Sequence, residues 1–480
     1  MTRPAPIDTV RLNHGDPMTT NPSSEITRAV ARYVVRSRWA DVPAAVQHKT
    51  VRSFLNWTGC AIRGSLHPAI DSALPVLRET AGAPQASVLG REDRLDMLNA
   101  ALLNGLSASA YAFDDTHLQT IAHPTAPAAA ALLALAEHRG MSGADFLHAL
   151  MIAIEVQCRL SNALARAPAH CHVGLYMTGI TGAAGVAAGV AKVLGLDEQH
   201  TIWAIGIGAA QGGGFRATHA SMCSGYVPAH AGRNGLLAGL LAAKGFTSTD
   251  TILEARNGFA DVFGSPADLS ALTDRLGEHF ECLAVAEKPY PAGVFVHPPI
   301  EACLALVAAD PPSPEMIASV ELRVHALALG LTGHREPRHA YEAQVSVYHW
   351  AAAALVHRAA DLAQASDACV ADPRVVAVRK RIEAVVDEAL GADEAIAILR
   401  LTDGSERRVH IDPCVGSARQ LMSDQQLERK FLAQVDDVLP AKRGRELAAQ
   451  CWNIAAAKDV GTVAPGVWGV RNHSGSPVPR

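Results

Sequence analysis

The fold is decided by the stretch VGLYMTGITGAAGVAAGVA, residues 173–191, which carries no charged side chain. The stretch is long enough to cross a membrane, but its Gly and Thr residues make it only weakly apolar. Small residues at this density allow two helices to pack closely. The stretch therefore predicts a buried core helix, and it argues against a membrane span.

The surrounding sequence continues the helical pattern. Apolar residues recur with helical spacing, and strand-like alternation is almost absent up to about residue 270. Short loops with Gly or Pro separate the helices, as expected for antiparallel neighbours. Residues 25–280 are therefore predicted to form an all-α domain, with helices over 26–37, 42–63, 96–113, 127–138, 143–163, 179–194, 200–211 and 230–244.

The pattern changes near Glu281. Residues 320–325 alternate apolar and polar side chains, which predicts a strand, and 395–401 with 407–411 predict a β-hairpin around a Gly-containing turn. Residues 348–362 and 374–390 are predicted to be helices. We expect a smaller α+β lid domain over 281–412.

The last helical segment, 423–457, is predicted to return to the first domain, which residues 413–463 then complete. The predicted fold class is mainly α, with a large all-α helical domain and a smaller α+β lid domain. Residues 1–24 and 464–480 are predicted to be disordered.

Charge and cysteine content exclude several classes of protein. The net charge is −5, the pI is about 6.5 and no basic stripe is present, so nucleic acid is not an expected partner. Nine scattered Cys without a Cys-x-x-Cys pair argue against zinc, iron–sulfur clusters and disulfides, so no metal site is expected. Without an apolar leader near the first residues, we expect a cytoplasmic protein with no membrane association.

Proton-transfer groups gather at 114–123. Asp114, Asp115 and His117 are followed by His123 directly before Pro124 and a helical run. A carboxylate beside an imidazole is typical of acid–base catalysis, since His titrates nearest neutral pH. The alternative is that the Asp pair caps the next helix and His123 occupies a turn. The local pattern leaves both interpretations open.

Two further segments carry groups that bind anions. Tyr176 and Thr178 stand where the uncharged helix begins, where free N–H groups point outward. Gly212–Gly214 permit close backbone approach, and Arg216 follows with a guanidinium suited to a carboxylate. Capping and packing explain Tyr176 and Thr178 equally well. The Gly run lacks the Lys-Ser or Lys-Thr of a P-loop, which disfavours nucleotide binding.

Candidates also occur at and beyond the domain boundary. Lys288 precedes Pro289, and His297 precedes Pro298, so this region offers a carboxylate partner and a proton carrier. A stiffened linker with a solvated Lys is the alternative. His349 begins a helix of the smaller domain, where it either closes over a cleft or simply packs.

In this order the motifs resemble the MmgE/PrpD family, whose members include 2-methylcitrate dehydratase, cis-aconitate decarboxylase and iminodisuccinate epimerase. The resemblance extends from about Ile26 to Phe431. The motifs that carry it are Leu103-Asn104-Gly105, Phe113-Asp114-Asp115-Thr116-His117, His123-Pro124, Thr178-Gly179, Ala229-His230-Ala231-Gly232-Arg233-Asn234-Gly235, Lys244-Gly245-Phe246-Thr247, Lys288-Pro289-Tyr290-Pro291, His297-Pro298 and Glu342-Ala343-Gln344 with Ser346.

The resemblance implies an active site between the two domains, a homodimer, and chemistry without a cofactor on small di- or tricarboxylates. The implied shared step is proton removal from, or addition to, a carbon next to a carboxylate. Loss of water, loss of CO2 or epimerisation then follows from the substrate.

The chain departs from the family pattern at several positions. Many members have His at Tyr176, Lys at Ser224 and Tyr at His349, and they tend to have His at Ser109 and Asp at Ala112. A missing Lys removes a carboxylate partner, and Tyr for His replaces a group that titrates near 6.5 by one near 10. These changes favour a shifted substrate or an epimerase-like use of Tyr176.

We assign roles on this basis as expectations. His123 is the expected general base, supported by Asp114 or Asp115, and Tyr176 or His297 is the expected proton donor. The expected carboxylate ligands are Lys288 and Arg216, with His117, Ser224 and His349 as further substrate-binding candidates. The expected activity is that of a cofactor-independent lyase, a dehydratase or decarboxylase. The alternatives are an epimerase or isomerase and a non-catalytic carboxylate-binding relative.

Overall fold

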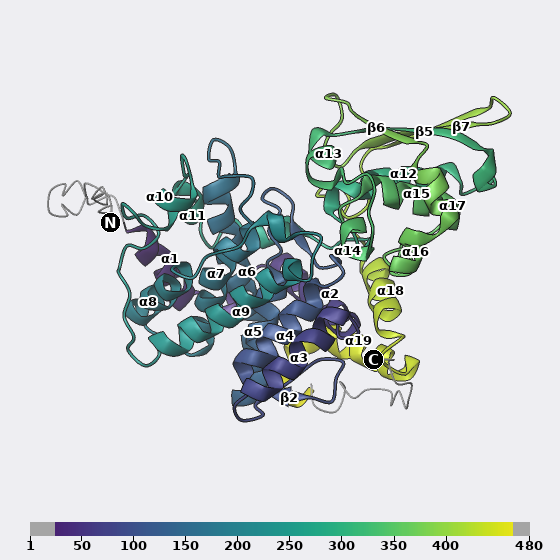
Figure 1. Ribbon diagram of the computed structural model, residues 1–480. Coiled ribbons are helices and arrows are strands. Elements are labelled where there is room, and N and C mark those ends of the chain that lie inside the picture. The colour runs from purple at the N-terminus through teal and green to yellow at the C-terminus, as the bar shows by residue number, and fades with distance from the viewer. Residues whose placement is uncertain (1–24, 464–480) are drawn as a thin grey trace, which may run out of the picture.

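The computed structural model describes residues 25–463, which are organised around two hydrophobic cores (Figure 1). The larger core is built from helices at both ends of the described chain. The smaller core lies within residues 292–401 and contains helices and a sheet. Helices dominate, which confirms the predicted mainly α fold. The segments predicted to be disordered, 1–24 and 464–480, lie outside the described residues.

Helices of the larger core pack directly on one another. From the first part of the chain they are α1 (Ile26–Arg36), η1 (Trp39–Asp41), α2 (Ala44–Gly64), α3 (Pro68–Thr80), α4 (Met97–Ser109), α5 (Thr125–Arg139), α6 (Gly143–Ala165), α7 (Met177–Val193), α8 (Glu198–Ala209), η2 (Arg216–Thr218), α9 (Cys223–Ala242), α10 (Phe259–Phe263), α11 (Ser270–Thr273) and η3 (Glu281–Ala284). From the end of the chain they are α18 (Asp424–Val435), α19 (Ala441–Trp452), η6 (Ile454–Ala456) and α20 (Val460–Val463), which return to α2 and α5.

The uncharged stretch forms α7, the central helix of this core, and residues 177–191 are all buried. Its glycines allow the neighbouring backbones to approach. A Cβ built on Gly185 would lie 2.7 Å from the backbone oxygen of Ala153 in α6, and a Cβ on Gly235 of α9 would lie 2.5 Å from Cβ of Val186. A side chain at either glycine would force the helices apart. Within residues 25–463, no helix combines the length and apolar character needed to span a bilayer.

The smaller core contains a four-stranded sheet in the order β6-β5-β7-β8. Its strands are β5 (Ile317–Val324), β6 (Ile382–Val386), β7 (Ala395–Leu401) and β8 (Glu406–Ile411). β5 pairs with β6 in parallel and with β7 antiparallel, and β7 and β8 form the predicted hairpin. The helices are η4 (Val294–Val296), α12 (His297–Leu306), η5 (Pro314–Met316), α13 (Ala326–Thr332), α14 (Ala340–Ala343), α15 (Val347–His357), α16 (Asp367–Ala371) and α17 (Pro373–Arg379). Figure 1 shows α12, α15 and α17 on the side of the sheet that faces the helical part.

The predicted helix over 374–390 is wrong. The segment forms α17 only to Arg379 and then turns into β6, where Ile382 and Ala384 are buried between exposed neighbours. β6 exists because Val320–Val324 of β5 supply parallel backbone partners about sixty residues away in sequence. A local pattern holds no information about such a partner. The predicted helix over 96–113 is also too long, since α4 ends at Ser109.

Two pairs of very short strands were not expected from the sequence. β1 (Ala86–Ser87) pairs with β2 (Arg94–Leu95), and β3 (Thr116–His117) pairs with β4 (Val285–Ala286). All four strands are antiparallel to their partners. The β3–β4 pair brings together two segments with predicted site residues, the one around Asp114 and the one around Lys288.

Glu287 fixes the chain directly after β4. Its carboxylate is fully buried and pairs with Lys49 and Arg52 of α2, and Arg52 also pairs with Asp424 of α18. Burial opposes ionisation, but the two cations hold the pKa of Glu287 below its ordinary value. Because a buried carboxylate requires both partners, α2, α18 and the segment after β4 are held in one arrangement.

The close approach of α6 and α7 makes Gly185 sensitive to added volume. We expect Gly185→Ala to lower the midpoint of thermal unfolding, at a cost of about 1–3 kcal/mol, because the backbone oxygen of Ala153 cannot move aside alone. Gly330→Ala is the matched control, since a Cβ there meets nothing within 4 Å and Ala favours helix α13. Scanning calorimetry of both variants checks this. An unchanged midpoint for Gly185→Ala would contradict the packing described for α7.

Candidate active site

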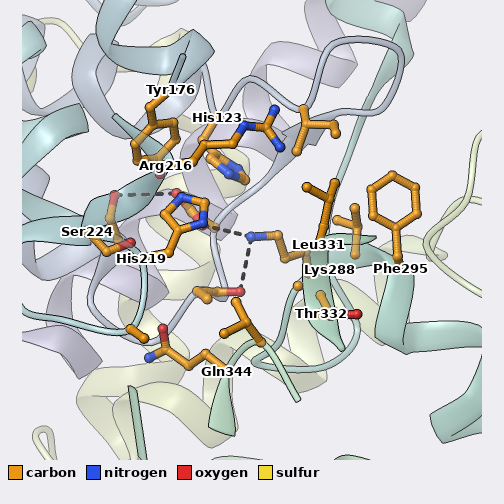
Figure 2. Close-up of a pocket in the computed structure, with 18 residues that line it drawn as sticks. His123, Tyr176, Arg216, His219, Ser224, Lys288, Phe295, Leu331, Thr332 and Gln344 are labelled. Carbon is orange, nitrogen blue, oxygen red and sulfur yellow. Dashed lines mark hydrogen bonds and ion pairs between the residues drawn. The ribbon is translucent and has the colours of Figure 1, made fainter. Parts of the chain in front are cut away.

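A cavity of about 90 Å³ lies where the helical part meets the α+β part (Figure 2). Its size suits a small ligand, since pockets for drug-sized molecules are several times larger. The helical side contributes Ser109, Ala112, Asp114, Ile121, His123, Tyr176, Arg216, His219, Ala220, Ser224 and Lys288. The α+β side contributes Gly293, Val294, Phe295, Leu331, Thr332, Gln344 and Val345. The charged and imidazole groups therefore stand on one wall, opposite a mainly apolar one.

The short pair β3–β4 brings Lys288 to Asp114. Thr116 is opposite Ala286, and extending this antiparallel register by two residues places Asp114 opposite Lys288. The Lys288 Nζ donates to Asp114 Oδ1 at 3.0 Å and to the backbone oxygen of Ala112 at 3.0 Å. Backbone pairing thus builds an ion pair between residues far apart in the chain.

The ion pair is buried, with side-chain exposures of 3% for Lys288 and 5% for Asp114. Burial alone would raise the pKa of Asp114, but the charge of Lys288 outweighs it and holds that pKa below its ordinary value. Ser109 Oγ also donates to Asp114 Oδ2, at 3.3 Å. Removal of either charged partner would leave the other uncompensated in a dry environment.

His123 offers a free basic nitrogen. Its Nδ1 lies 2.8 Å from the backbone oxygen of Asp115 and 3.0 Å from Thr116 Oγ1. Because a carbonyl oxygen only accepts, Nδ1 carries the proton and the lone pair is on Nε2. Burial and the charge of Lys288 lower the pKa of His123 to about 4, so the ring is neutral at pH 7. Thr178 Oγ1 accepts the backbone N–H of His123 at 2.8 Å, which holds the backbone of His123 against α7.

Tyr176 contacts two imidazoles directly before α7. Its ring makes edge contacts with His123 and His219, at centroid separations of 6.1 Å and 4.9 Å. Burial, and then the charge of Asp114, raise the pKa of Tyr176, so the phenol keeps its proton. Burial also lowers the pKa of His219 to about 4. The cavity therefore holds two neutral imidazoles and a neutral phenol at pH 7.

Arg216 lies in the cavity wall and, unlike Lys288, has no carboxylate partner among the described residues. Its Nε donates to the backbone oxygen of Leu175 at 3.2 Å, and its backbone N–H donates to Gly174. Its two Nη groups make no hydrogen bond to any residue in 25–463 and are free to grip a carboxylate. Burial lowers the pKa of Arg216, which reflects the cost of keeping this charge unpaired. Ser224, at the start of α9, presents its hydroxyl to the same cavity.

Backbone strain is concentrated around this cavity. Ala112, Ile121 and Ala220 line it, and each has a positive φ, at 51°, 58° and 65°. Positive φ is costly for a residue with a Cβ, above all for β-branched Ile, and such strain gathers at functional sites. Two of these residues bracket the segment that carries Asp114.

Asp115 points away from the cavity. Its carboxylate accepts from Thr125 Oγ1 at 2.5 Å and from the Thr125 backbone N–H at 3.4 Å, where α5 begins. Burial raises the pKa of Asp115 to about 7. Asp114 lines the cavity and Asp115 does not. Asp115 thus anchors the helix start, as the capping interpretation expects.

Three of the predicted histidines also lie outside this cavity. His117 is buried beside Glu281, with its Nε2 3.6 Å from the carboxylate. His297 begins α12, lies within 3.3 Å of the backbone oxygen of Ala292, and faces a neighbouring cavity. His349 is buried in α15 with its Nε2 2.9 Å from the backbone oxygen of Gln364. None of the three can contact a ligand bound between Arg216 and Lys288 without rearrangement.

His219, Gln344 and the apolar wall were missed by sequence reasoning. His219 directly follows η2, three residues after Arg216. Its closeness in sequence to a predicted carboxylate ligand was the signal that could have marked it as a site residue. Gln344 reaches Ala110 with its Nε2, which donates to that backbone oxygen at 3.0 Å. No local pattern marks Phe295 or Leu331, because their place depends on how the two parts meet.

One group of possible metal ligands occurs within the described residues. Oxygen and nitrogen atoms of Glu394, His410 and Asp412 lie within 4.8 Å of one another at one end of β7 and β8. Arg419 pairs with Glu394 at 2.9 Å and with Asp412 at 2.6 Å. Because the guanidinium already pairs with both carboxylates, this group is a surface ion-pair network.

Comparison with known proteins gives the family. Residues 28–272 match the MmgE/PrpD N-terminal domain, and residues 290–454 match the MmgE/PrpD C-terminal domain. A cis-aconitate decarboxylase-like protein, oryM, of Aspergillus oryzae is 30% identical over 251 residues, which are 50% of this chain and 52% of oryM. Cis-aconitate decarboxylase of Aspergillus terreus is 25% identical over 295 residues, 59% of this chain and 60% of that protein.

The aligned part of the chain thus spans about half to three-fifths of the curated relatives that it matches. The two domain matches follow each other without overlap and divide near residue 280, where the sequence pattern changes. Together they cover most of the described residues. The chain belongs to the MmgE/PrpD family.

Proposed function

We propose that this protein is a lyase of the dehydratase or decarboxylase type, acting on a small di- or tricarboxylate. The reaction begins with removal of a proton from a carbon next to a carboxylate and uses side chains alone. The observation that carries the proposal is the free Nε2 of a neutral His123, which lies on the same cavity wall as the Asp114–Lys288 pair and the unpaired Arg216. The names of the two Aspergillus relatives support the same class of substrate.

His123 acts as the general base in this proposal. Its pKa of about 4 keeps Nε2 unprotonated at neutral pH. Above pH 4 the folded protein holds the imidazole neutral, whereas the unfolded chain takes up its proton below about pH 6.5. Stability therefore falls as pH drops from about 6.5 toward 4, and the base itself remains available throughout that range.

Arg216 and Lys288 stabilise the negative charge that develops. When the C–H proton moves to Nε2, the electron pair spreads onto the adjacent carboxylate, which then carries excess charge. The Arg216 Nη groups are directed to this charge without a competing carboxylate, and Lys288 adds a second cation at the same wall. Such preorganised cations lower the barrier most when water is excluded.

Tyr176 supplies the second proton. In a dehydration the C–O bond breaks as the new C=C bond forms, and the departing hydroxide takes the phenolic proton to leave as water. The raised pKa of Tyr176 means that the phenol is protonated at the start of each turnover. The phenolate and the imidazolium then exchange a proton through solvent, which restores both groups.

An epimerase is the second candidate. Epimerisation needs one proton carrier on each face of the substrate carbon, and the raised pKa of Tyr176 argues against Tyr176 as a base. His219 contacts the same Tyr176 ring as His123 and is also neutral. This pair of imidazoles is the observation that favours an epimerase.

The role of His123 is tested by hydrogen exchange. We expect the wild-type protein in D2O to introduce deuterium next to a carboxylate of 2-methylcitrate, cis-aconitate or iminodisuccinate, as measured by proton NMR. His123→Gln should reduce that exchange by about 100-fold or more, since the general base is lost. A new alkene or lost CO2 would identify a lyase, and inversion alone would identify an epimerase.

His349→Gln is the matched control for this experiment. His349 is a buried histidine that also contacts a backbone oxygen, but it lies outside the cavity. We expect its exchange rate to remain within about threefold of wild type. Equal exchange by wild type and His123→Gln would remove His123 from the mechanism.

Arg216 should act mainly in binding. Because its Nη groups have no protein partner, Arg216→Ala removes a carboxylate ligand without unpairing another charge. We expect KM to rise by about 10- to 100-fold, with a smaller effect on kcat. Steady-state kinetics on the best substrate of the panel measure this. An unchanged KM would exclude Arg216 as a ligand of the substrate carboxylate.

We propose that the protein forms a homodimer through exposed apolar residues that lie within three residues of Tyr176, Arg216 or Ser224 in the sequence. Val173, Phe215, Met222 and Tyr226 are exposed, at 69%, 64%, 42% and 42%, and Leu175 forms a β-bridge with Phe215 beside Arg216. Exposed apolar residues that gather in one place mark interaction sites. Phe215→Ser combined with Tyr226→Ser should halve the mass measured by sedimentation equilibrium. An unchanged mass would place the interface elsewhere or exclude it.

A further inference from the structure

Lys430 of α18 buries an ammonium group with neutral partners only. Its Nζ donates to Asn56 Oδ1 at 2.6 Å and to the backbone oxygen of Phe113 at 2.8 Å. The same ammonium lies 3.9 Å from the centroid of the Phe113 ring. Burial lowers the pKa of Lys430, as expected for a cation without a carboxylate beside it.

The Phe113 carbonyl is held from two helices. Besides Lys430, the thiol of Cys60 in α2 donates to the same oxygen at 3.2 Å, and Gln434 of α18 donates to Cys60 Sγ at 3.3 Å. Both lone pairs of this carbonyl are thereby used. The carbonyl lies outside any regular helix or strand, so these bonds replace the partners that secondary structure would give.

Holding this oxygen fixes Asp114. A peptide unit is planar, so the Phe113 oxygen and the Asp114 nitrogen move as one body. The preceding carbonyl, that of Ala112, is held by Lys288. The ammonium groups of Lys288 and Lys430 therefore hold two consecutive carbonyl groups directly before Asp114. The first of these carbonyls belongs to Ala112, whose backbone has the strained left-handed conformation.

We propose that Lys430 is a positioning residue, which acts on the active site through the Phe113 carbonyl and sets the place of Asp114 against Lys288 and His123. This inference rests on the proposed function for its effect on turnover, but the placement of Asp114 is independent of that function. A buried, unpaired charge is costly, and an apolar residue of similar length would fill the same space more cheaply. The hydrogen bond from Lys430 to the Phe113 carbonyl accounts for a cation at position 430.

A reaction-independent measurement tests the placement first. Asp114 interacts electrostatically with His123, so a shift of Asp114 must change the environment of the His123 ring. The Cε1–H resonance of His123 is assigned by its loss in His123→Gln. We expect Lys430→Met to move this resonance or its titration midpoint, whereas a fixed resonance would overturn the proposal.

Lys192→Met is the matched control. Lys192 also donates to two backbone oxygens, those of Val35 at 3.0 Å and Ser37 at 2.6 Å, but it joins α1 to α7 away from the cavity. Loss of this lysine removes the same kind of interaction. We expect the His123 resonance to be unchanged in this variant, and an equal shift in both variants would mean that Lys430 acts only through general stability.

Chemical rescue then tests the effect on turnover. Lys430 lines a cavity of about 500 Å³ between α18 and residues 361–363, so small molecules can reach the space left by Lys430→Ala. Propylammonium has the atoms that this substitution removes. We expect Lys430→Ala to lower kcat by about tenfold or more with KM nearly unchanged, because misplacement affects the chemical step. Propylammonium should recover much of that loss, and neutral 1-propanol should recover little.

The outcomes separate the two proposals. Wild-type protein that turns over no carboxylate, together with a His123 resonance that moves in Lys430→Met, would reject the proposed function and keep the positioning role. Unchanged kcat in folded Lys430→Ala would reject the positioning role and keep the proposed function. Should Lys430→Ala fail to fold, the same kcat comparison is made with Lys430→Met, where full activity again rejects the role.

Discussion

The buried ion pair between Asp114 and Lys288 is the constraint on which the rest of the site depends. Neither charge can be buried alone, so the loop before β3 and the segment after β4 must meet wherever the protein is folded. Glu287 and its two cationic partners hold one side of this contact. The other side is held by the hydrogen bonds of Lys288 and Lys430 to the two carbonyls before Asp114. The contact lies where the helical and α+β parts join, so the cavity forms together with the tertiary structure.

Burial then sets the protonation states around this pair. Burial in the cavity wall disfavours the charged forms of His123, His219 and Tyr176, so each of these groups is neutral at pH 7. Asp114 offsets part of the charge of Lys288, and Arg216 is the cation of this wall without a carboxylate partner. An anionic ligand is favoured by that charge, and the neutral imidazoles beside it remain free to accept a proton.

The helical part and the α+β part of the molecule each form one wall of the cavity, and the two walls differ in chemical character. The helical part contributes the charged and titratable groups from segments that are held by α2, α7 and α18. The α+β part contributes Val294, Phe295 and Leu331, which cover the polar wall with apolar surface. A wall of this kind excludes water and strengthens the interactions opposite it. Local strain at Ala112, Ile121 and Ala220 falls on the side where the chemistry is proposed.

Local sequence patterns predict the helical class, the change of pattern near residue 280, the β7–β8 hairpin and the segments in which the chemical groups occur. These follow from periodicity and turn residues, which act over a few neighbours. Only the tertiary structure decided that Asp114 and not Asp115 faces the cavity, that His117, His297 and His349 lie elsewhere, that His219 belongs to the site, and that residues 382–386 form a strand. Each of these depends on a partner distant in the chain, such as Ala286 for Thr116 or Val320 for Ile382, and no local pattern contains that partner.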